Sequence, residues 1–464
     1  MIKLTFKQLA KILSFKGDIP AGGFCGVSTD TRTLEPGNLF VGLKGDRGID
    51  GSEFVSPAIK KGASAALVNE TAVDSGATDW VRDDKLWKVP DTIKALGQLA
   101  TYWRNQFELP IIAITGSNGK TTIKNMVGAI LQQACQDQIE QVLISHSSFN
   151  NPIGVPLSLF RLNQQHKCAV LEMGMSHFGE IAYLSRMVRP NIAVISNALS
   201  SHLKGVGDLD GVAKAKAEIF TGLESNKFQK SYAILNADDH YFNYWIKQAK
   251  NHEVISFSIE NPSNIMARDL QLYPDYSQFI VCAKSGDITI KISLPGKHNV
   301  MNALAAISAC LSMKIDLQII KKGLEQVAAA DNRLQVVTTK EGACILNDCY
   351  NANPASLRAA IDVLVTYAGK KILVLGDMKE LGAQEEALHA EMGQYAAQAG
   401  VDEVLAIGKL SKHFVTAFNQ NARHFDTKED LIEYLRTFLA KGTTILIKGS
   451  RSMQLEEVIE KVLD

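Results

Sequence analysis

The sequence predicts an α/β protein of three domains, and three observations support this. The chain has 464 residues, more than one ordinary hydrophobic core accommodates. From Ile111 onward, short apolar runs alternate with helical patterns, which is typical of a mostly parallel, doubly wound sheet. After Arg333 the alternation starts again. We therefore expect domains at 1–108, 109–328 and 329–464, the first and second α/β and the third a doubly wound, Rossmann-like unit.

The N-terminal segment is Gly-rich and irregular. Its strand-like runs are short, "NLFVGL" at 38–43 and "ASAALV" at 63–68, and a helical pattern follows at 91–107 before Pro110. Lysines interrupt the apolar runs at the start of the chain, so we expect no secretory signal. Since no window approaches the roughly 18 apolar residues of a membrane span, we expect none.

Composition narrows the class of protein further. Acidic and basic residues balance at 49 each, which argues against a nucleic-acid-binding protein. The seven cysteines are scattered and never spaced as C-x-x-C, which favours reduced thiols in a cytoplasmic protein over a disulfide frame or a zinc site.

Polar residues end the predicted strands of the second and third domains. These strands are expected at 111–115, 141–145, 168–173, 191–197, 232–236, 343–348, 371–377, 403–409 and 444–450. Their carboxyl ends carry Thr115, Glu172, Asn197, Asp348, Asp377 and Lys448. Ligands of open α/β sheets bind beyond these ends, so the sequence predicts a site there, although strand ends are often polar anyway.

The stretch "ITGSNGKTT" (114–122) predicts a phosphate-binding loop in a P-loop ATPase-like domain. It is a shortened form of the full P-loop pattern, with Ile114 where the first glycine would stand. Gly116 and Gly119 would let backbone N–H groups turn inward, toward the positive end of a helix at 120–134. Lys120 would add a charge on the β- and γ-phosphates, and Thr121 a hydroxyl for Mg²⁺. A merely structural glycine turn is the weaker interpretation.

Three further residues have both a functional and a structural interpretation. Glu172, at a strand end, is either a Mg²⁺ ligand or a hydrogen-bonded acid at a helix start. His202, alone in a loop, is as a rule solvated. Lys216 shares a helical stripe with Val212, Ile219 and Phe220, so it points either into a core or site, or snorkels to solvent. Lys214 lies on the opposite side, where it could pair with Glu218.

Several motifs together resemble one family. "TGSNGKTT", "LEMGMSHFGEIA", "SSHLKGVGDLDGVAKAKAEIF", "LPGKHNVMNALAA" and "LNDCYNANPASL" occur in the order found in the Mur ligases of peptidoglycan synthesis. "STDTRTLEPGNLFVGLKGDR" resembles the UDP-binding region of these enzymes, and "LGDMKELG" and "KGSRSMQLEEV" resemble their C-terminal domain. The resemblance covers nearly the whole chain.

This resemblance implies a function. It implies ATP- and Mg²⁺-dependent ligation of D-alanyl-D-alanine to a UDP-N-acetylmuramoyl-tripeptide through an acyl phosphate, by a cytoplasmic, monomeric enzyme of cell-wall synthesis. Rival interpretations are a UDP-MurNAc-dipeptide ligase, a folylpolyglutamate synthase and, more remotely, a nucleotide switch without ligase activity. The absence of a "DNPR"-type motif argues against the diaminopimelate-adding enzyme, and the UDP-binding region against the folate enzyme.

The resemblance also implies roles for individual residues. The ATP phosphates would lie on Gly116, Ser117, Asn118, Gly119, Lys120, Thr121 and Thr122, and the metals on Thr121, Glu172, His202 and Lys216, the last as a carbamate. Adenine would face His298, Asn299 and Asn302, and ATP would also contact Arg333 and Asp348. The uridine would lie near Thr29, Asp30 and Arg32, and the dipeptide near Lys448, Ser450 and Arg451. Ser148 replaces an asparagine found in many relatives, which puts its contact in doubt.

Overall fold

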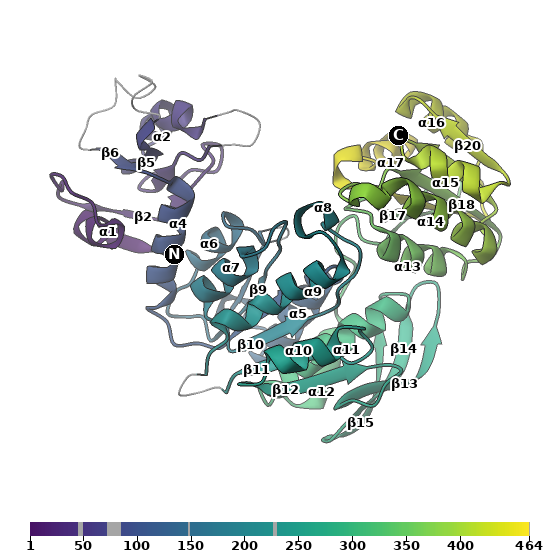
Figure 1. Cartoon of the computed structure of the whole chain (residues 1–464), viewed down its shortest axis with the longest axis horizontal. Coiled ribbons are helices and arrows are strands. Elements are labelled where there is room, and N and C mark those ends of the chain that lie inside the picture. Colours follow the sequence, from purple (N-terminus) through teal and green to yellow (C-terminus); the bar gives the residue numbers. More distant parts are fainter. Residues whose placement is uncertain (45–49, 72–84, 147–148, 226–229, 464) are drawn as a thin grey trace.

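A computed structural model describes residues 1–44, 50–71, 85–146, 149–225 and 230–463; Ser148 lies outside them. The described chain forms three groups of sheets and helices. In Figure 1 the N-terminal part (purple to blue) and the C-terminal part (green to yellow) both lie above the central part, on opposite sides. The predicted α/β class is confirmed, while the boundaries at 108 and 328 stay predictions.

The N-terminal part contains two small sheets. One is an antiparallel pair, and the other has four parallel strands in the order β3-β4-β5-β6. The elements are β1 (Lys3–Thr5), α1 (Phe6–Leu13), β2 (Gly23–Cys25), β3 (Val27–Ser28), β4 (Leu39–Val41), α2 (Val55–Lys60), β5 (Ala65–Asn69), β6 (Leu86–Val89) and α4 (Thr92–Arg104). Helix α4 packs on α6 (Gly154–Leu159) and α7 (Glu180–Val188) of the central part, so one core cluster runs from Ile2 to Ala249.

The central part is a nine-stranded sheet in the order β15-β14-β13-β12-β11-β10-β7-β9-β8. Its parallel strands are β7 (Ile111–Thr115), β8 (Val142–Ile144), β9 (Cys168–Glu172), β10 (Ile192–Ile195), β11 (Tyr232–Asn236), β12 (Glu253–Ser258) and β13 (Ile265–Leu272). Strands β14 (Ser277–Ala283) and β15 (Gly286–Ile292) add an antiparallel edge. The sequence did not predict β12 to β15. In β14 and β15 buried residues alternate with more exposed ones instead of forming one apolar run.

Helices cover both faces of this sheet. Helices α5 (Lys120–Ala134), α11 (Lys297–Ser312) and α12 (Leu317–Glu325) pack on one core cluster, and α7 (Glu180–Val188) and α9 (Leu209–Ala217) on another. The shorter helices are α6 (Gly154–Leu159), α8 (Leu203–Val206) and α10 (Phe242–Gln248). Because β7 lies between β9 and β10, the ends of these three strands meet at the start of α5.

The C-terminal part is a six-stranded sheet in the order β16-β17-β21-β18-β19-β20, parallel except for β16. Its strands are β16 (Gln335–Thr338), β17 (Cys344–Asp348), β18 (Lys370–Gly376), β19 (Glu403–Ile407), β20 (Ala422–Phe425) and β21 (Thr443–Lys448). Helices α13 (Pro354–Leu364), α14 (Glu385–Ala399) and α15 (Ser411–Phe418) cover one face, and α16 (Lys428–Arg436) and α17 (Glu456–Leu463) the other. The predicted second doubly wound unit is therefore confirmed.

The close crossing of α4 and α7 generates a prediction about stability. A Cβ built on Gly97 would lie 1.8 Å from the Tyr183 hydroxyl oxygen and 3.1 Å from Met187 Cε. Alanine normally favours a helix over glycine by about 1 kcal/mol. Here we expect Gly97→Ala to lower the free energy of unfolding by about 1–3 kcal/mol, because the Tyr183 and Met187 side chains must leave their packed positions. Urea denaturation measures the change.

The matched variant is Tyr183→Phe. The Tyr183 hydroxyl is buried and has no hydrogen-bond partner among the described residues, so its removal should not cost stability. The double variant should therefore recover part of the loss, since the nearest colliding atom is gone. Equal losses in the single and double variants would contradict this packing.

Candidate functional site

The loop between β7 and α5 requires glycine at both predicted positions. Gly116 has a φ of +146°, and a Cβ there would lie 1.8 Å from Ser196 Oγ. Gly119 has a φ of +85°, and a Cβ there would lie 2.2 Å from Asn302 Oδ1. A side chain at either position would therefore collide with the wall of the site.

Hydrogen bonds fasten the loop to the end of β10. The Ser117 amide donates to Asn197 O at 3.0 Å, and the Asn118 amide to Asn197 Oδ1 at 2.9 Å. Ser196 Oγ donates to Asn118 O at 2.6 Å. The amides of Ser117 and Asn118 are therefore already hydrogen-bonded within the protein, whereas the sequence predicted that amides of this loop would bind the phosphates. The amides left for an anion are those of the first turn of α5, where the helix dipole also favours negative charge.

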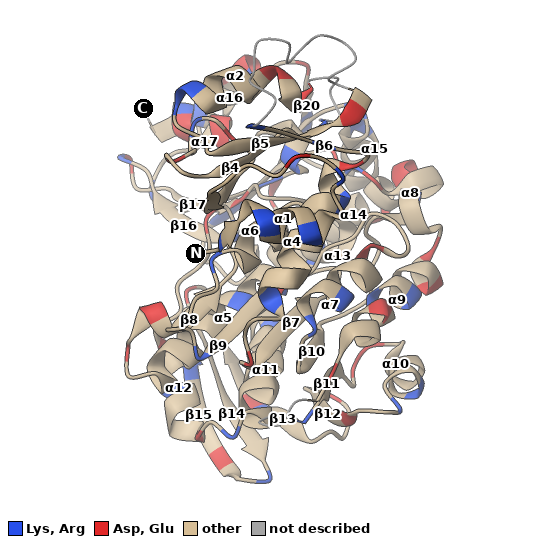
Figure 2. Cartoon of the chain, turned by 90° about the vertical axis from the view of Figure 1, so that its left-hand side faces the viewer, with Lys and Arg blue, Asp and Glu red and all other residues tan. Residues whose placement is uncertain are grey.

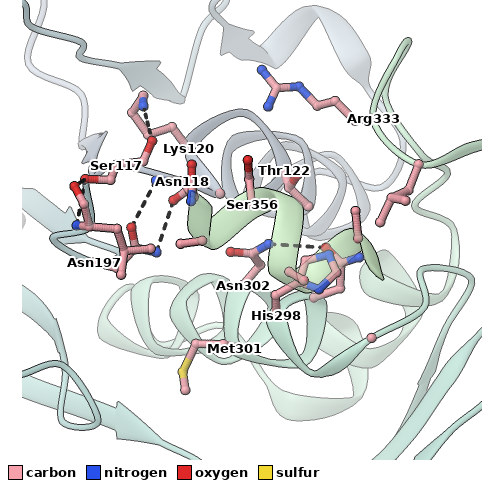
Figure 3. A pocket seen from close by; sticks show the side chains of 18 of the residues that line it. Ser117, Asn118, Lys120, Thr122, Asn197, His298, Met301, Asn302, Arg333 and Ser356 are labelled. Carbon is pink, nitrogen blue, oxygen red and sulfur yellow. Dashed lines mark hydrogen bonds between the residues drawn. The ribbon is translucent and has the colours of Figure 1, made fainter. Parts of the chain in front are cut away.

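Lys120 lies folded over its own loop. Its Nζ donates to Gly116 O at 2.8 Å and to Ser117 O at 3.1 Å. Figure 3 shows Lys120 beside Ser117 and Asn118. Burial lowers the pKa of Lys120, and the charge of Glu172 opposes that shift. To contact a phosphate, the ammonium would exchange these carbonyls for phosphate oxygens.

Glu172 lies beneath this loop, because β9 pairs with β7 and places Glu172 opposite Ile114. Its Oε2 accepts from Thr121 Oγ1 at 2.7 Å, and its Oε1 accepts from Asn150 Nδ2 at 2.7 Å. Burial opposes its ionisation, but the charge of Lys120 and these two hydrogen bonds lower its pKa overall. A buried carboxylate beside a hydroxyl fits the oxygen ligands that Mg²⁺ prefers.

Arg333 reaches the same group of residues from the segment before β16. Its Nη2 donates to Thr121 Oγ1 at 3.1 Å, and its guanidinium stacks on the Tyr350 ring at 3.9 Å. Across the described chain, no three His, Cys, Asp or Glu side chains are grouped as a metal centre. In the predicted metal site, the Glu172 carboxylate and the Thr121 hydroxyl are therefore the two candidate ligand groups that contact each other.

Lys216 is buried, with 1% of its surface exposed, whereas Lys214 is exposed. Of the two directions that helical spacing left open for Lys216, the structure shows the inward one. Burial lowers the pKa of Lys216 well below its usual value, and the nearby charge of Lys120 lowers it further.

The predicted pairing of Lys214 with Glu218 was wrong. Glu218 instead accepts from the Gly179 and Ala182 amides at 2.8 and 3.1 Å, because the start of α7 lies beside it.

The start of α11 forms another wall. Asn302 Nδ2 donates to Asn299 Oδ1 at 3.2 Å, and Asn299 Nδ2 donates to Pro295 O at 2.8 Å. Burial, together with the charge of Lys448, lowers the pKa of His298 to about 4, so its ring is neutral near pH 7. Figure 3 shows His298, Met301 and Asn302 on this wall, below the loop.

The C-terminal part closes the site. Lys448, only 2% exposed, lies 2.5 Å from Asp348 Oδ2 and donates to Asn351 O at 2.9 Å. Asn118 and Asn353 exchange amide hydrogen bonds of 3.2 and 2.8 Å across the two parts.

A cavity of about 1320 Å³ between the central and C-terminal parts brings most of the predicted residues together. Its lining includes Ser117, Asn118, Gly119, Lys120, Thr121, Thr122, Glu172, His202, His298, Asn299, Asn302, Arg333, Asp348 and Lys448. It does not include Gly116, Lys216, Ser450, Arg451, Thr29, Asp30 or Arg32.

The remaining predicted residues lie elsewhere. Arg451 lies 2.6 Å from Glu456, and Ser450 Oγ accepts from the Lys379 amide at 2.8 Å. In the N-terminal part Arg32 forms a bidentate contact with Asp30, whose pKa falls to about 2 through these hydrogen bonds. Thr29 lies next to that pair in the sequence.

Sequence reasoning did not single out Asn150 or Glu380. Asn150 holds Glu172, and Glu380 lies against His202. The asparagine pair in "FNNPIG" was a usable signal for Asn150. Nothing in the sequence indicates which residue Glu380 contacts.

Comparisons with known proteins agree with this geometry. Three family models match: "Mur ligase family, catalytic domain" at 24–104, "Mur ligase middle domain" at 114–310, and "Mur ligase, glutamate ligase domain" at 332–451. The UDP-N-acetylmuramoyl-tripeptide–D-alanyl-D-alanine ligase of Escherichia coli (strain K12) is 39% identical over 99% of this chain and 98% of its own length. The chain belongs to the Mur ligase family.

Further relatives support this membership and the fold. The enzyme of the same name from Bacillus subtilis (strain 168) is 35% identical over 100% of this chain and 99% of its own length. A crystal structure of MurF from Acinetobacter baumannii is similar with a TM-score of 0.89 and 32% identity, covering 100% of this chain and 99% of that one. As a Mur ligase, the chain is an ATP-dependent peptide ligase with the three-domain architecture of the family.

Gly119 gives a sharp test of the anion site. Gly119→Ala should weaken ATP binding at least 100-fold, measured by isothermal titration calorimetry, because its Cβ would collide with Asn302 beside the free amides. Gly179 is the matched control: it also precedes a helix, with φ 85° and ψ −17° against 85° and −12°, but a Cβ there meets nothing within 4 Å. Both variants carry about 1–2 kcal/mol of backbone strain. Equal ATP affinities in the two variants would contradict this site.

Proposed function

We propose that this Mur ligase joins D-alanyl-D-alanine to the terminal carboxylate of a UDP-N-acetylmuramoyl-tripeptide in peptidoglycan precursor synthesis. One observation carries the proposal. A single cavity combines an anion-binding helix start, a buried carboxylate–hydroxyl pair and cationic side chains, in a chain that matches D-alanyl-D-alanine ligases along its whole length.

The chemistry fits these residues. An oxygen of the tripeptide carboxylate takes the γ-phosphoryl group of ATP, giving an acyl phosphate and ADP. The amine of D-alanyl-D-alanine then attacks the acyl carbon, loses a proton and expels phosphate. Phosphoryl transfer between anions needs charge neutralisation and positioning more than covalent help. Lys120, Arg333 and the first turn of α5 provide positive charge at one end of the cavity.

Mg²⁺ would supply further neutralisation of the phosphate oxygens when bound. Thr121 and Glu172 would hold the first ion. The loop from Ser117 to Thr122 would surround the phosphates of ATP. His202 and Lys216 would serve a second ion. A neutral Lys216 amine would attack CO₂ and lose a proton, which gives a carbamate with two oxygens. Its burial supports this assignment, because burial favours the neutral amine, the form that reacts with CO₂, over the ammonium.

The remaining assignments are also proposals. His298, Asn299 and Asn302 would face adenine, and Arg333 and Asp348 would contact the rest of ATP. Thr29, Asp30 and Arg32 would bind the uridine end of the other substrate. Lys448, Ser450 and Arg451 would contact the dipeptide only if the contacts of Lys448 with Asp348 and of Arg451 with Glu456 opened.

We also propose a cytoplasmic, monomeric enzyme without nucleic-acid partners. No helix in the described part of the chain has the length and apolar character needed to cross a membrane. Basic and acidic residues are interspersed in the view of Figure 2, without the basic face expected for nucleic-acid binding.

Substrate omission distinguishes this function from its rivals. We expect phosphate release only when ATP, Mg²⁺, the UDP-linked tripeptide and D-alanyl-D-alanine are all present. A nucleotide switch would hydrolyse ATP slowly without either acceptor, and a folate enzyme would need a folate and glutamate. Phosphate release that continues at full rate without D-alanyl-D-alanine, or none with the complete set, would rule out the proposed ligation.

Lys216 and Lys214 form a matched pair for testing the carbamate. Lys216→Ala should reduce kcat by at least 1000-fold, and millimolar acetate or formate should restore part of it by replacing the lost carboxylate. Lys214→Ala, on the exposed side of the same helix, should leave kcat unchanged. Unimpaired turnover of Lys216→Ala would eliminate the carbamate.

A further inference from the structure

His202 and Glu380 meet across the boundary between the central and C-terminal parts. His202 immediately precedes α8, and Glu380 follows β18 in the C-terminal sheet. His202 Nδ1 lies 2.8 Å from Glu380 Oε2. Figure 1 shows α8 at the edge of the central part that faces the C-terminal part. The contact therefore depends on how the two parts are arranged.

Both residues adopt an unfavourable backbone conformation. His202 has a φ of +56° and Glu380 a φ of +66°, in the left-handed region that non-glycine residues rarely enter. Such a conformation costs about 1–3 kcal/mol per residue and persists only when surrounding interactions maintain it. The side-chain contact therefore joins two backbone positions of this uncommon kind.

Close packing does not by itself force these side chains together. Leu203, Lys204, Leu381 and Gly382, which follow them in the sequence, line a second cavity of about 620 Å³. The 2.8 Å approach of the two side chains is therefore a specific contact at this boundary, beside open space.

The contact limits which ring nitrogen of His202 can reach the site. Nδ1 lies at ion-pair distance from Glu380, without the alignment of a hydrogen bond, and Nε2 is the nitrogen left for the large cavity that His202 lines. Histidines that bind metal ions usually present their other nitrogen to a carboxylate, which sets the tautomer and ring orientation. The chain supplies this carboxylate from a different domain.

We propose that Glu380 is a positioning residue for His202, and that approach of the C-terminal domain completes the metal-binding side of the site by bringing Glu380 to it. This inference rests on the proposed function of His202. According to this proposal, the His202 imidazole is oriented only when the C-terminal domain lies where it does in this structure. Glu380 need not touch either substrate.

The test measures Mn²⁺ binding to the enzyme with a non-hydrolysable ATP analogue, by electron paramagnetic resonance. Glu380→Ala should weaken Mn²⁺ binding 10- to 100-fold, as should His202→Ala. The double variant should bind no more weakly than His202→Ala, because Glu380 acts through His202. Glu380→Gln, which keeps an acceptor oxygen, should fall between the wild type and Glu380→Ala.

Two controls separate positioning from structural effects. Glu386→Ala removes another exposed acid near a histidine, His413 at 3.8 Å within the C-terminal part, and should bind Mn²⁺ like the wild type. Glu380→Gly relieves the backbone strain and should still lose affinity. Wild-type affinity in Glu380→Ala, or losses that multiply in the double variant, would overturn the proposal. Because this binding needs neither acceptor nor amine, it tests Glu380 separately from the ligation.

Discussion

The charge of Glu172 is the constraint on which the site depends. A carboxylate that is only 3% exposed must be compensated by hydrogen bonds and positive charge, or it would be neutralised. Thr121 from α5 and Asn150 from the loop after β8 each donate to one of its oxygens. These bonds hold the start of α5 over the end of β9. The same arrangement that stabilises the buried charge also directs the free amides of α5 into the cavity.

The same group of residues connects the site to domain arrangement. Arg333 donates to Thr121, Asn353 exchanges hydrogen bonds with Asn118, and Glu380 lies against His202. A fourth contact, from Tyr367 Oη to Pro274 O at 2.9 Å, lies at the antiparallel edge of the central sheet. Three of the four involve residues expected to bind nucleotide or metal. The contacts that join the central and C-terminal parts therefore involve the same residues that form the site, an arrangement suited to excluding water from a reactive intermediate.

Local patterns in the sequence were sufficient to predict some features and insufficient for others. Apolar runs predicted β7, β9, β10 and β11, because buried parallel strands need them. Helical spacing placed Lys216 on the apolar stripe and Lys214 on the opposite side, but it left open whether Lys216 is buried or snorkels to solvent. It could not predict that Glu218 would face the start of α7 instead of Lys214, because that contact is tertiary. The contacts of Asn150 and Glu380 were missed for the same reason, and β14 and β15 because their buried residues alternate with more exposed ones.

The central claim is that this cavity activates a carboxylate with ATP, and an isotope-transfer measurement tests it most directly. The tripeptide is labelled with oxygen-18 in its terminal carboxylate and converted with ATP and D-alanyl-D-alanine, and the released phosphate is analysed by mass spectrometry. An acyl phosphate moves one carboxylate oxygen into phosphate, so the account predicts one labelled oxygen in each phosphate released. Unlabelled phosphate accompanying ligated product would contradict it.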